Sequence, residues 1–90
     1  MQSKNKKAMT AAERKHVGAI KEMSCVICDA PPPSEAHEPK QGSWFLSIPL
    51  CAGCHRGTNG WHGTKAMWRI KKWDEMDALN ETYRRLFTQT

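Results

Sequence analysis

The sequence lacks any long apolar run. No stretch of its 90 residues approaches the ~20 consecutive apolar residues that a membrane-spanning helix needs. The N-terminal stretch is charged from its fourth residue and contains no apolar segment of signal-peptide length. We therefore expect no membrane partner and a cytoplasmic location, where closely spaced cysteines bind metal more often than they pair with each other.

Acidic residues are scarce near the N-terminus. Over residues 1–21, Glu13 is the single acid among six basic side chains, and the whole chain has a net charge of +5. Such an excess of positive charge favours a polyanion such as DNA as partner. A solvated basic surface that aids solubility explains the charge equally well.

The length allows one small domain. We expect a flexible basic tail over residues 1–9 and a single domain over residues 10–90. A core this small commonly needs a metal ion or disulfides for stability. No internal repeat appears beyond a doubled C-x-x-C, so the fold must be read from individual segments.

Helices are predicted at both ends of the domain. Thr10 and Glu13 match a capping box that begins a helix running to about residue 23. Thr64 is a plausible N-cap for a second helix, and Asp74 begins a third. Apolar residues at helical spacing mark the expected buried face of this third helix: Met76, Leu79, Tyr83, Leu86 and Phe87.

Strands are predicted in the middle of the chain. Residues 34–38 begin one strand, and residues 44–51, rich in aromatic and branched side chains, are the better candidate for a second. Pro49 would have to lie at an edge or a strand end. Together these segments would form a hairpin, which makes the expected fold a small α+β domain.

Two C-x-x-C pairs predict a zinc site. Cys25 and Cys28 are followed after twenty-two residues by Cys51 and Cys54, and two such turns can complete a tetrahedron of thiolates. Four thiolates leave no open position, so this zinc would be structural. Two disulfides or a redox C-x-x-C are the alternatives. The string C-x-x-C-H also matches c-type haem attachment, which a cytosolic chain does not support.

Three histidines remain once the cysteines are assigned. The hairpin would bring His37 toward His55, which directly follows a cysteine. A glycine-rich loop over residues 57–63 could fold His62 back beside His55. Two imidazoles can hold a divalent cation with open positions, and the third can take a proton from an attacking water.

The order C-x-x-C, His, strand, C-x-x-C-H, helix resembles the HNH, or ββα-metal, nucleases. The match narrows to phage recombination-enhancement nucleases of the Ref type, which residues 10–87 resemble. Its most specific part is PLCxxCHxGxxGWHG. The resemblance implies an HNH core with a four-cysteine zinc, flanked by an N-terminal helix and C-terminal helices. It also implies a phage- or prophage-encoded DNA endonuclease that acts with a RecA-type recombinase filament of the bacterial host.

The resemblance implies roles for individual residues. His37 would be the general base, and His55 and His62 would hold catalytic Mg²⁺ or Mn²⁺, with zinc as a further option. We expect a basic and aromatic group to contact DNA: Lys65, Arg69, Lys71, Lys72 and Trp61.

Two positions depart from the HNH pattern. Ala36 stands where many members carry a metal ligand, so Glu35, Glu38 or His62 would replace it. Leu46 stands where the middle Asn usually orients the base, and a backbone carbonyl could hold the base instead.

A noncatalytic zinc-ribbon module that binds DNA or a protein is the main alternative, because it explains the cysteines and the charge. A small phage assembly protein is a second alternative. For either function we expect a monomer or a weak dimer.

Overall fold

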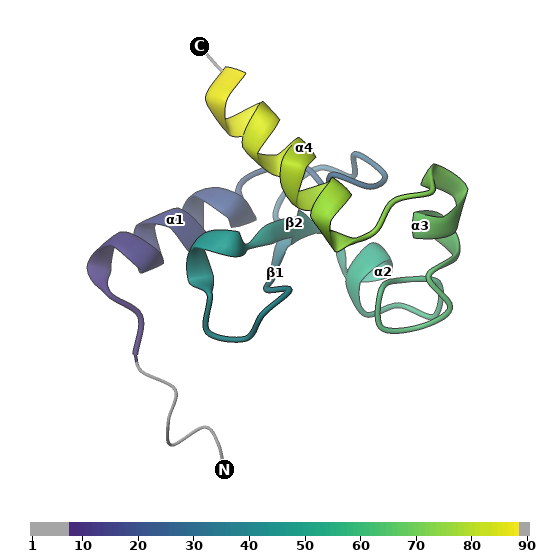
Figure 1. Cartoon of the computed structure of the whole chain (residues 1–90), viewed down its shortest axis with the longest axis horizontal. Helices are drawn as coiled ribbons and strands as arrows, with labels where there is room; N and C mark the ends of the chain where they lie inside the picture. Colours follow the sequence, from purple (N-terminus) through teal and green to yellow (C-terminus); the bar gives the residue numbers. More distant parts are fainter. Residues whose placement is uncertain (1–7, 89–90) are drawn as a thin grey trace.

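A computed structural model describes residues 8–88, which fold around a two-stranded antiparallel sheet. In chain order the elements are α1 (Ala11–Lys21), β1 (Glu35–His37), the 3-10 turn η2 (Trp44–Leu46), β2 (Ile48–Leu50), α2 (Ala52–His55), α3 (Ala66–Lys71) and α4 (Glu75–Thr88). Figure 1 shows α1 and the α2–α3 segment at opposite ends of the hairpin. The predicted α+β class is confirmed. Of the predicted basic tail, residues 1–7 lie outside the described range.

The hairpin sets the position of the first histidine. His37 is the last residue of β1 and pairs with Ile48, while Ala36 pairs with Pro49. A strand does form within residues 34–38, but it spans three residues and ends at His37 instead of beginning there. Pro49 is tolerated because both strands of a two-stranded sheet are edge strands.

The strand predicted over residues 44–51 is mostly wrong, because β2 spans Ile48–Leu50 alone. Residues 44–46 form the turn η2 instead. Leu46 N donates to Ser43 O at 2.9 Å, and Ser47 Oγ donates to Trp44 O at 2.6 Å. These local hydrogen bonds compete with strand pairing, so residues 44–46 form a turn and the strand begins only at Ile48.

Helix α1 forms as its sequence predicts. The Thr10 side chain accepts a hydrogen bond from Glu13 N, and the Glu13 carboxylate accepts one from Thr10 N. The capping box is therefore confirmed. Val17 and Ile20 are buried on its inner face, and Met23 is buried just beyond its end.

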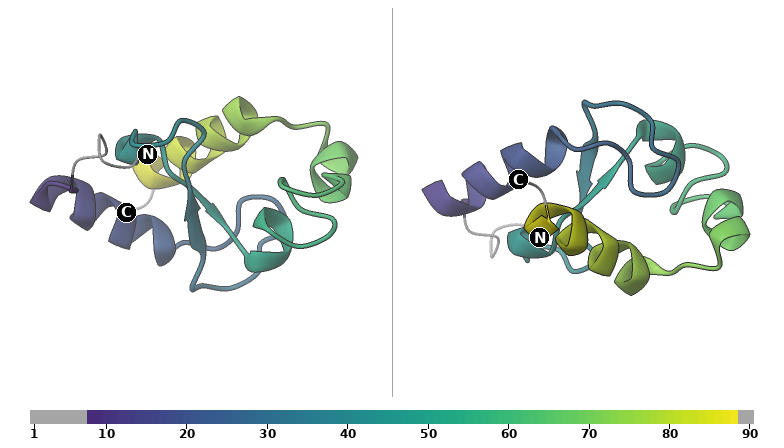
Figure 2. Two further views of the ribbon diagram at one scale, coloured as in Figure 1. Left: turned by 90° about the horizontal axis from the view of Figure 1, so that it is seen from below. Right: turned by 90° about the horizontal axis from the view of Figure 1, so that it is seen from above.

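Helix α4 packs across β2, and its buried face overlaps the predicted one in part, because Leu79 is buried and Tyr83 packs against the core (Figures 1 and 2). Ala78 and Thr82 are fully buried, whereas Met76 is 67% exposed and Phe87 is 81% exposed. Small side chains let the helix approach the strand closely, and the Thr82 hydroxyl donates to Ala78 O at 2.8 Å. Close packing, rather than the size of the apolar side chains, selects the buried face.

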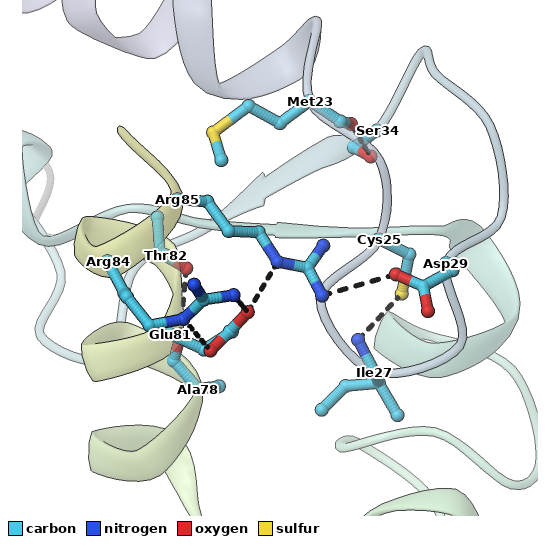
Figure 3. Close-up of polar contacts among 10 residues, drawn as sticks. All are labelled: Met23, Cys25, Ile27, Asp29, Ser34, Ala78, Glu81, Thr82, Arg84 and Arg85. Carbon is cyan, nitrogen blue, oxygen red and sulfur yellow. Dashed lines mark hydrogen bonds and ion pairs between the residues drawn. The ribbon is translucent and has the colours of Figure 1, made fainter. Parts of the chain in front are cut away.

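The segment after α1 is fastened to both α1 and α4 (Figure 3). Ser34 N donates to the carbonyl of Lys21, the last residue of α1, at 2.8 Å, and Ser34 Oγ donates to Met23 O at 2.6 Å. Arg85 of α4 lies 3.2 Å from the Asp29 carboxylate. Val26 N donates to Pro49 O, on β2. The first cysteine pair is therefore held against the hairpin by contacts that do not involve its sulfur atoms.

One apolar cluster connects the hairpin, α2, α3 and α4. Its buried members are Cys25, Val26, Ile27, Ile48, Leu50, Cys54, Trp68, Ala78 and Leu79. Trp68 is 1% exposed, and its indole N–H donates to Cys54 O at 3.0 Å. Within residues 8–88, no helix is both long and apolar enough to cross a bilayer.

Overpacking the α4 face tests this arrangement. We expect Ala78→Leu to lower the free energy of unfolding by about 1–3 kcal/mol, because a buried site in close contact with β2 has no room for the larger side chain. Met76→Leu on the exposed face should change it by less than ~0.5 kcal/mol. Urea unfolding of both variants measures the difference, and equal stability would contradict the packing.

Candidate metal centres

The four cysteine sulfurs form one cluster. All four thiols are free, and their Sγ atoms lie within 4.8 Å of one another. Cys28 and Cys51 bring their sulfurs to 3.6 Å, and the amides of Ile27 and Cys54 donate to Cys25 Sγ and Cys51 Sγ at 3.4 Å. The turns of both pairs therefore point their sulfurs at a common centre.

This donor set fits zinc. Tetrahedral zinc with Zn–S bonds of about 2.3 Å places sulfurs roughly 3.8 Å apart, close to the Cys28–Cys51 separation. Burial, followed by the neighbouring Cys25, raises the pKa of the Cys54 thiol. A bound cation reverses this effect, because it stabilises thiolates that burial alone disfavours. The cluster can therefore hold a zinc ion, and the alternative of two disulfides is not what the structure shows, because all four cysteines are free.

The three histidines singled out in the sequence form a second cluster. One ring nitrogen from each of His37, His55 and His62 lies within 4.8 Å of the others. His37 Nδ1 is 3.1 Å from His55 Nε2, and the His62 ring centre is 5.4 Å and 5.0 Å from those of His37 and His55. The prediction that hairpin and loop bring these residues together is confirmed.

The glycine-rich loop places His62 by packing on the backbone of α2. Trp61 N donates to Cys54 O at 2.9 Å, and His62 N donates to His55 O at 3.1 Å. A Cβ atom at Gly60 would lie 2.5 Å from Gly53 O, so this position has no space for a side chain. The loop's glycines thus permit the contact that aligns the two histidines.

A carboxylate lies behind His55. His55 Nδ1 is 2.8 Å from Glu35 Oε1, and Arg56 donates to both oxygens of Glu35. These bonds, from Arg56 first and then His55, lower the pKa of the Glu35 carboxyl to about 2. Burial lowers the pKa of His55 despite the opposing effect of Glu35, so the ring is neutral at pH 7.

A second carboxylate lies behind His37. Glu75 Oε2 is 2.5 Å from His37 Nε2. An ionised carboxylate only accepts hydrogen bonds, so the outer nitrogens of His37 and His55 must both donate. With both rings neutral, their inner nitrogens present lone pairs to each other across 3.1 Å. A cation held at this centre would offset that repulsion, so the cluster fits a metal ion.

The histidine cluster opens onto a pocket of about 280 Å³. Its lining includes Ala36, Glu38 and Gln41 beside the three histidines. Of the acids considered as replacement ligands, Glu35 is bound to His55 and Arg56, and Glu38 accepts a hydrogen bond from Gly42 N at 2.8 Å. Of the three candidate ligands in place of Ala36, His62 is the one whose side chain belongs to the histidine cluster.

The predicted DNA-contacting residues surround α3. The N-cap of α3 is Lys65 and not Thr64; its backbone is left-handed and makes no side-chain cap. Thr64 instead donates to the Asn59 side chain. Arg69 and Lys71 lie within α3, and Lys72 caps its C-terminus.

Trp61 joins this basic segment to the histidines. It is half-buried, and its ring centre lies 4.6 Å from that of Trp68 and 6.3 Å from that of His37. Lys65 Nζ is 4.1 Å from the Trp61 ring centre. Lys65 and Trp68 already contact the Trp61 ring. The expected stacking of Trp61 on a base would therefore have to use the part of the ring that these two side chains do not cover.

Glu75 and Arg56 are site residues that were not predicted from the sequence. Arg56 adjoins His55 in the sequence, which was a signal for a charged neighbour of the site. Glu75 precedes Ala78, Leu79 and Thr82 by three, four and seven residues, the spacing of one helical face. That pattern was hidden because the larger apolar side chains of α4 indicated a face that overlaps it only in part.

Comparisons with known proteins found no matching family model, curated protein or solved structure.

Adding one methyl group to the loop tests how His62 is placed. We expect Gly60→Ala to lower the free energy of unfolding by at least ~1–3 kcal/mol, because the Cβ would meet the α2 backbone. Gly18→Ala is the matched control. It has open space in helix α1 and should stabilise the protein by about 0.5–1 kcal/mol. Thermal unfolding measures both, and a harmless Gly60→Ala would contradict the packing described.

Proposed function

We propose that this chain is a metal-dependent DNA endonuclease of the HNH type, which hydrolyses phosphodiester bonds. The observation that carries the proposal is the cluster of three imidazoles beside an open pocket. Its inner nitrogens face a common centre, and its outer nitrogens on His37 and His55 are bound to carboxylates. Metal-binding histidines in proteins commonly have such carboxylate partners.

The order of the elements supports the HNH assignment. Strands β1 and β2 are followed directly by α2, with His37 ending β1 and His55 ending α2. This corresponds to the hairpin and helix that the sequence resemblance implies for a ββα-metal core. The four-cysteine cluster lies next to it, because Cys51 and Cys54 lie at the start and in the last turn of the same short helix.

The ligands favour a particular class of ion. Imidazole suits transition metals such as zinc, whereas Mg²⁺ prefers oxygen ligands and retains several waters. His55 and His62 supply nitrogen. Of the nearby carboxylates, Glu35 and Glu75 are bound to histidine or arginine, and Glu38 accepts a hydrogen bond from Gly42 N. We therefore propose Zn²⁺ as the catalytic ion that these ligands favour, with Mn²⁺ or Mg²⁺ as the alternatives and a separate zinc ion as the structural one.

The protein residues divide the work of hydrolysis. His55 and His62 would hold the ion, which offsets charge on the phosphate and the leaving oxygen. His37 Nδ1 faces the same centre and would take a proton from the attacking water. General base catalysis of this kind typically contributes ~100- to 10,000-fold in rate.

Phosphate contacts would come from the basic segment around α3. Lys65 contacts Trp61, whose ring centre lies 6.3 Å from that of His37, and Arg69, Lys71 and Lys72 continue the positive charge along and after α3. Such contacts hold the DNA backbone and carry little sequence information. Binding should therefore weaken steeply as salt concentration rises.

The proposal has three further parts. The enzyme would act on DNA held by a RecA-type recombinase, it would be encoded by a phage or prophage, and it would be located in the bacterial cytoplasm. They rest on the sequence resemblance. A noncatalytic zinc-ribbon module would explain the cysteines and the charge, but it gives no reason for three imidazoles with two carboxylate partners around one pocket.

Cleavage assays with His37→Ala test the proposed chemistry. We expect wild-type protein with Mn²⁺, Zn²⁺ or Mg²⁺ to cut single-stranded, plasmid or recombinase-paired DNA, and the variant to lose about 100- to 10,000-fold in kcat. This corresponds to a few kcal/mol in barrier, at about 1.4 kcal/mol for each tenfold. The variant should still fold and should bind zinc at the wild-type content, because His37 contributes no atom to the four-cysteine cluster.

His16→Ala is the matched control, because His16 lies on α1 with its ring 5.4 Å from that of Phe45 and outside the histidine cluster. It should cut at the wild-type rate. If a folded, zinc-bearing wild-type protein cuts none of these substrates with any of the three ions, the proposed endonuclease activity is contradicted. The noncatalytic zinc-ribbon module would then be the remaining function.

A further inference from the structure

Glu75 reaches the histidine cluster from an element that plays no part in the ββα pattern. Its contact with His37 joins the first residue of α4 to the last residue of β1. The His37 side chain is 7% exposed and that of Glu75 is 25% exposed, so the bond is largely shielded from water. A shielded hydrogen bond to a charged acceptor holds a side chain more firmly than an exposed one.

The start of α4 is built so that Glu75 faces the hairpin. Asp74 N donates to the Asp77 carboxylate at 2.9 Å, and Asp77 N donates to the Asp74 carboxylate at 3.0 Å. This reciprocal cap fixes where the helix begins. Ala78 and Thr82 are fully buried, and helical spacing places Glu75 on their side of the helix.

Glu75 differs from the other acid on the inner side of α4. Glu81 accepts hydrogen bonds from Arg84 and Arg85, which lower the pKa of its carboxyl to about 2 (Figure 3). Within residues 8–88, Glu75 forms no ion pair with a Lys or Arg, and its partner is His37. Because Glu75 has no Lys or Arg partner in this part of the chain, its carboxylate is available to accept the hydrogen bond that orients the His37 imidazole.

We propose that Glu75 is a positioning residue for His37. It accepts the Nε2 proton, which fixes the tautomer and leaves the Nδ1 lone pair directed toward His55 and the pocket. This role rests on the proposed endonuclease activity, in which Nδ1 takes a proton from water. It replaces the support that the HNH Asn would give at the position of Leu46, and it supersedes the backbone carbonyl considered from the sequence.

The tautomer can be measured without any nuclease activity. In zinc-bearing protein labelled with ¹⁵N-histidine, at alkaline pH where imidazoles are neutral, the His37 nitrogen shifts should report a proton on Nε2 in the wild type. Glu75→Ala should give a mixture of tautomers. Glu75→Gln should retain more of the Nε2–H form than Glu75→Ala, because its amide oxygen can accept the same proton.

Kinetics then test what the tautomer does. Loss of the hydrogen-bond partner of a metal-site histidine typically costs about 10–100-fold in metal affinity or activity, and we take the same range for a histidine that acts as base beside the metal. We expect Glu75→Ala to lower kcat by about 10–100-fold. Its KM and the affinity of the histidine cluster for Mn²⁺ should stay near the wild-type values. Glu81→Ala, the same change at a site on the same helix that contacts no histidine, should keep the wild-type kcat.

The outcomes separate this proposal from the proposed function. An Nδ1–H tautomer in the wild type, or an unchanged kcat in Glu75→Ala, would overturn the positioning role even if the protein cuts DNA. A parallel loss of Mn²⁺ affinity and kcat would overturn it too, because His37 would then be a metal ligand. A wild type with the Nε2–H form that cuts nothing would instead refute the endonuclease and leave the contact standing.

Discussion

The mutual approach of four cysteine thiols is the constraint on which the rest of the structure depends. Two come from the turn after α1 and two from the ends of α2, so their common centre ties the N-terminal half to the C-terminal half. Structural zinc sites contribute about 10–16 kcal/mol, as much as the whole stability of a typical domain at about 5–15 kcal/mol. For a core of this size, a zinc ion in this cluster would decide whether the chain folds.

The histidine centre depends on that frame. His55 lies one residue after Cys54, and the loop that carries His62 bonds to the carbonyls of both. His37 comes from the strand that pairs with β2, the segment leading into Cys51. Fixing the cysteines thus fixes all three imidazoles, while the imidazoles contribute nothing to the four-sulfur set. One cluster can serve folding and the other chemistry because no side chain belongs to both.

Sequence reasoning succeeded where spacing along the chain determines geometry. The doubled C-x-x-C, the capping box and the approach of His37 to His55 all follow from local turns and one hairpin. It failed where packing between distant elements decides. The buried face of α4 runs through Ala78 instead of Met76, because close approach to β2 rewards small side chains. The partner of His37 was missed for the same reason, since Glu75 is 38 residues away and meets it only across that interface.

The number of metal ions per chain tests whether the cysteines and the histidines form two separate metal centres. Native mass spectrometry, with excess Zn²⁺ or Mn²⁺, would count the ions in wild-type protein and in a variant with His37, His55 and His62 all changed to Ala. We expect one tightly held zinc and a second, weaker ion in the wild type, and the tight zinc alone in the variant. A single ion in both proteins would contradict a separate histidine metal centre.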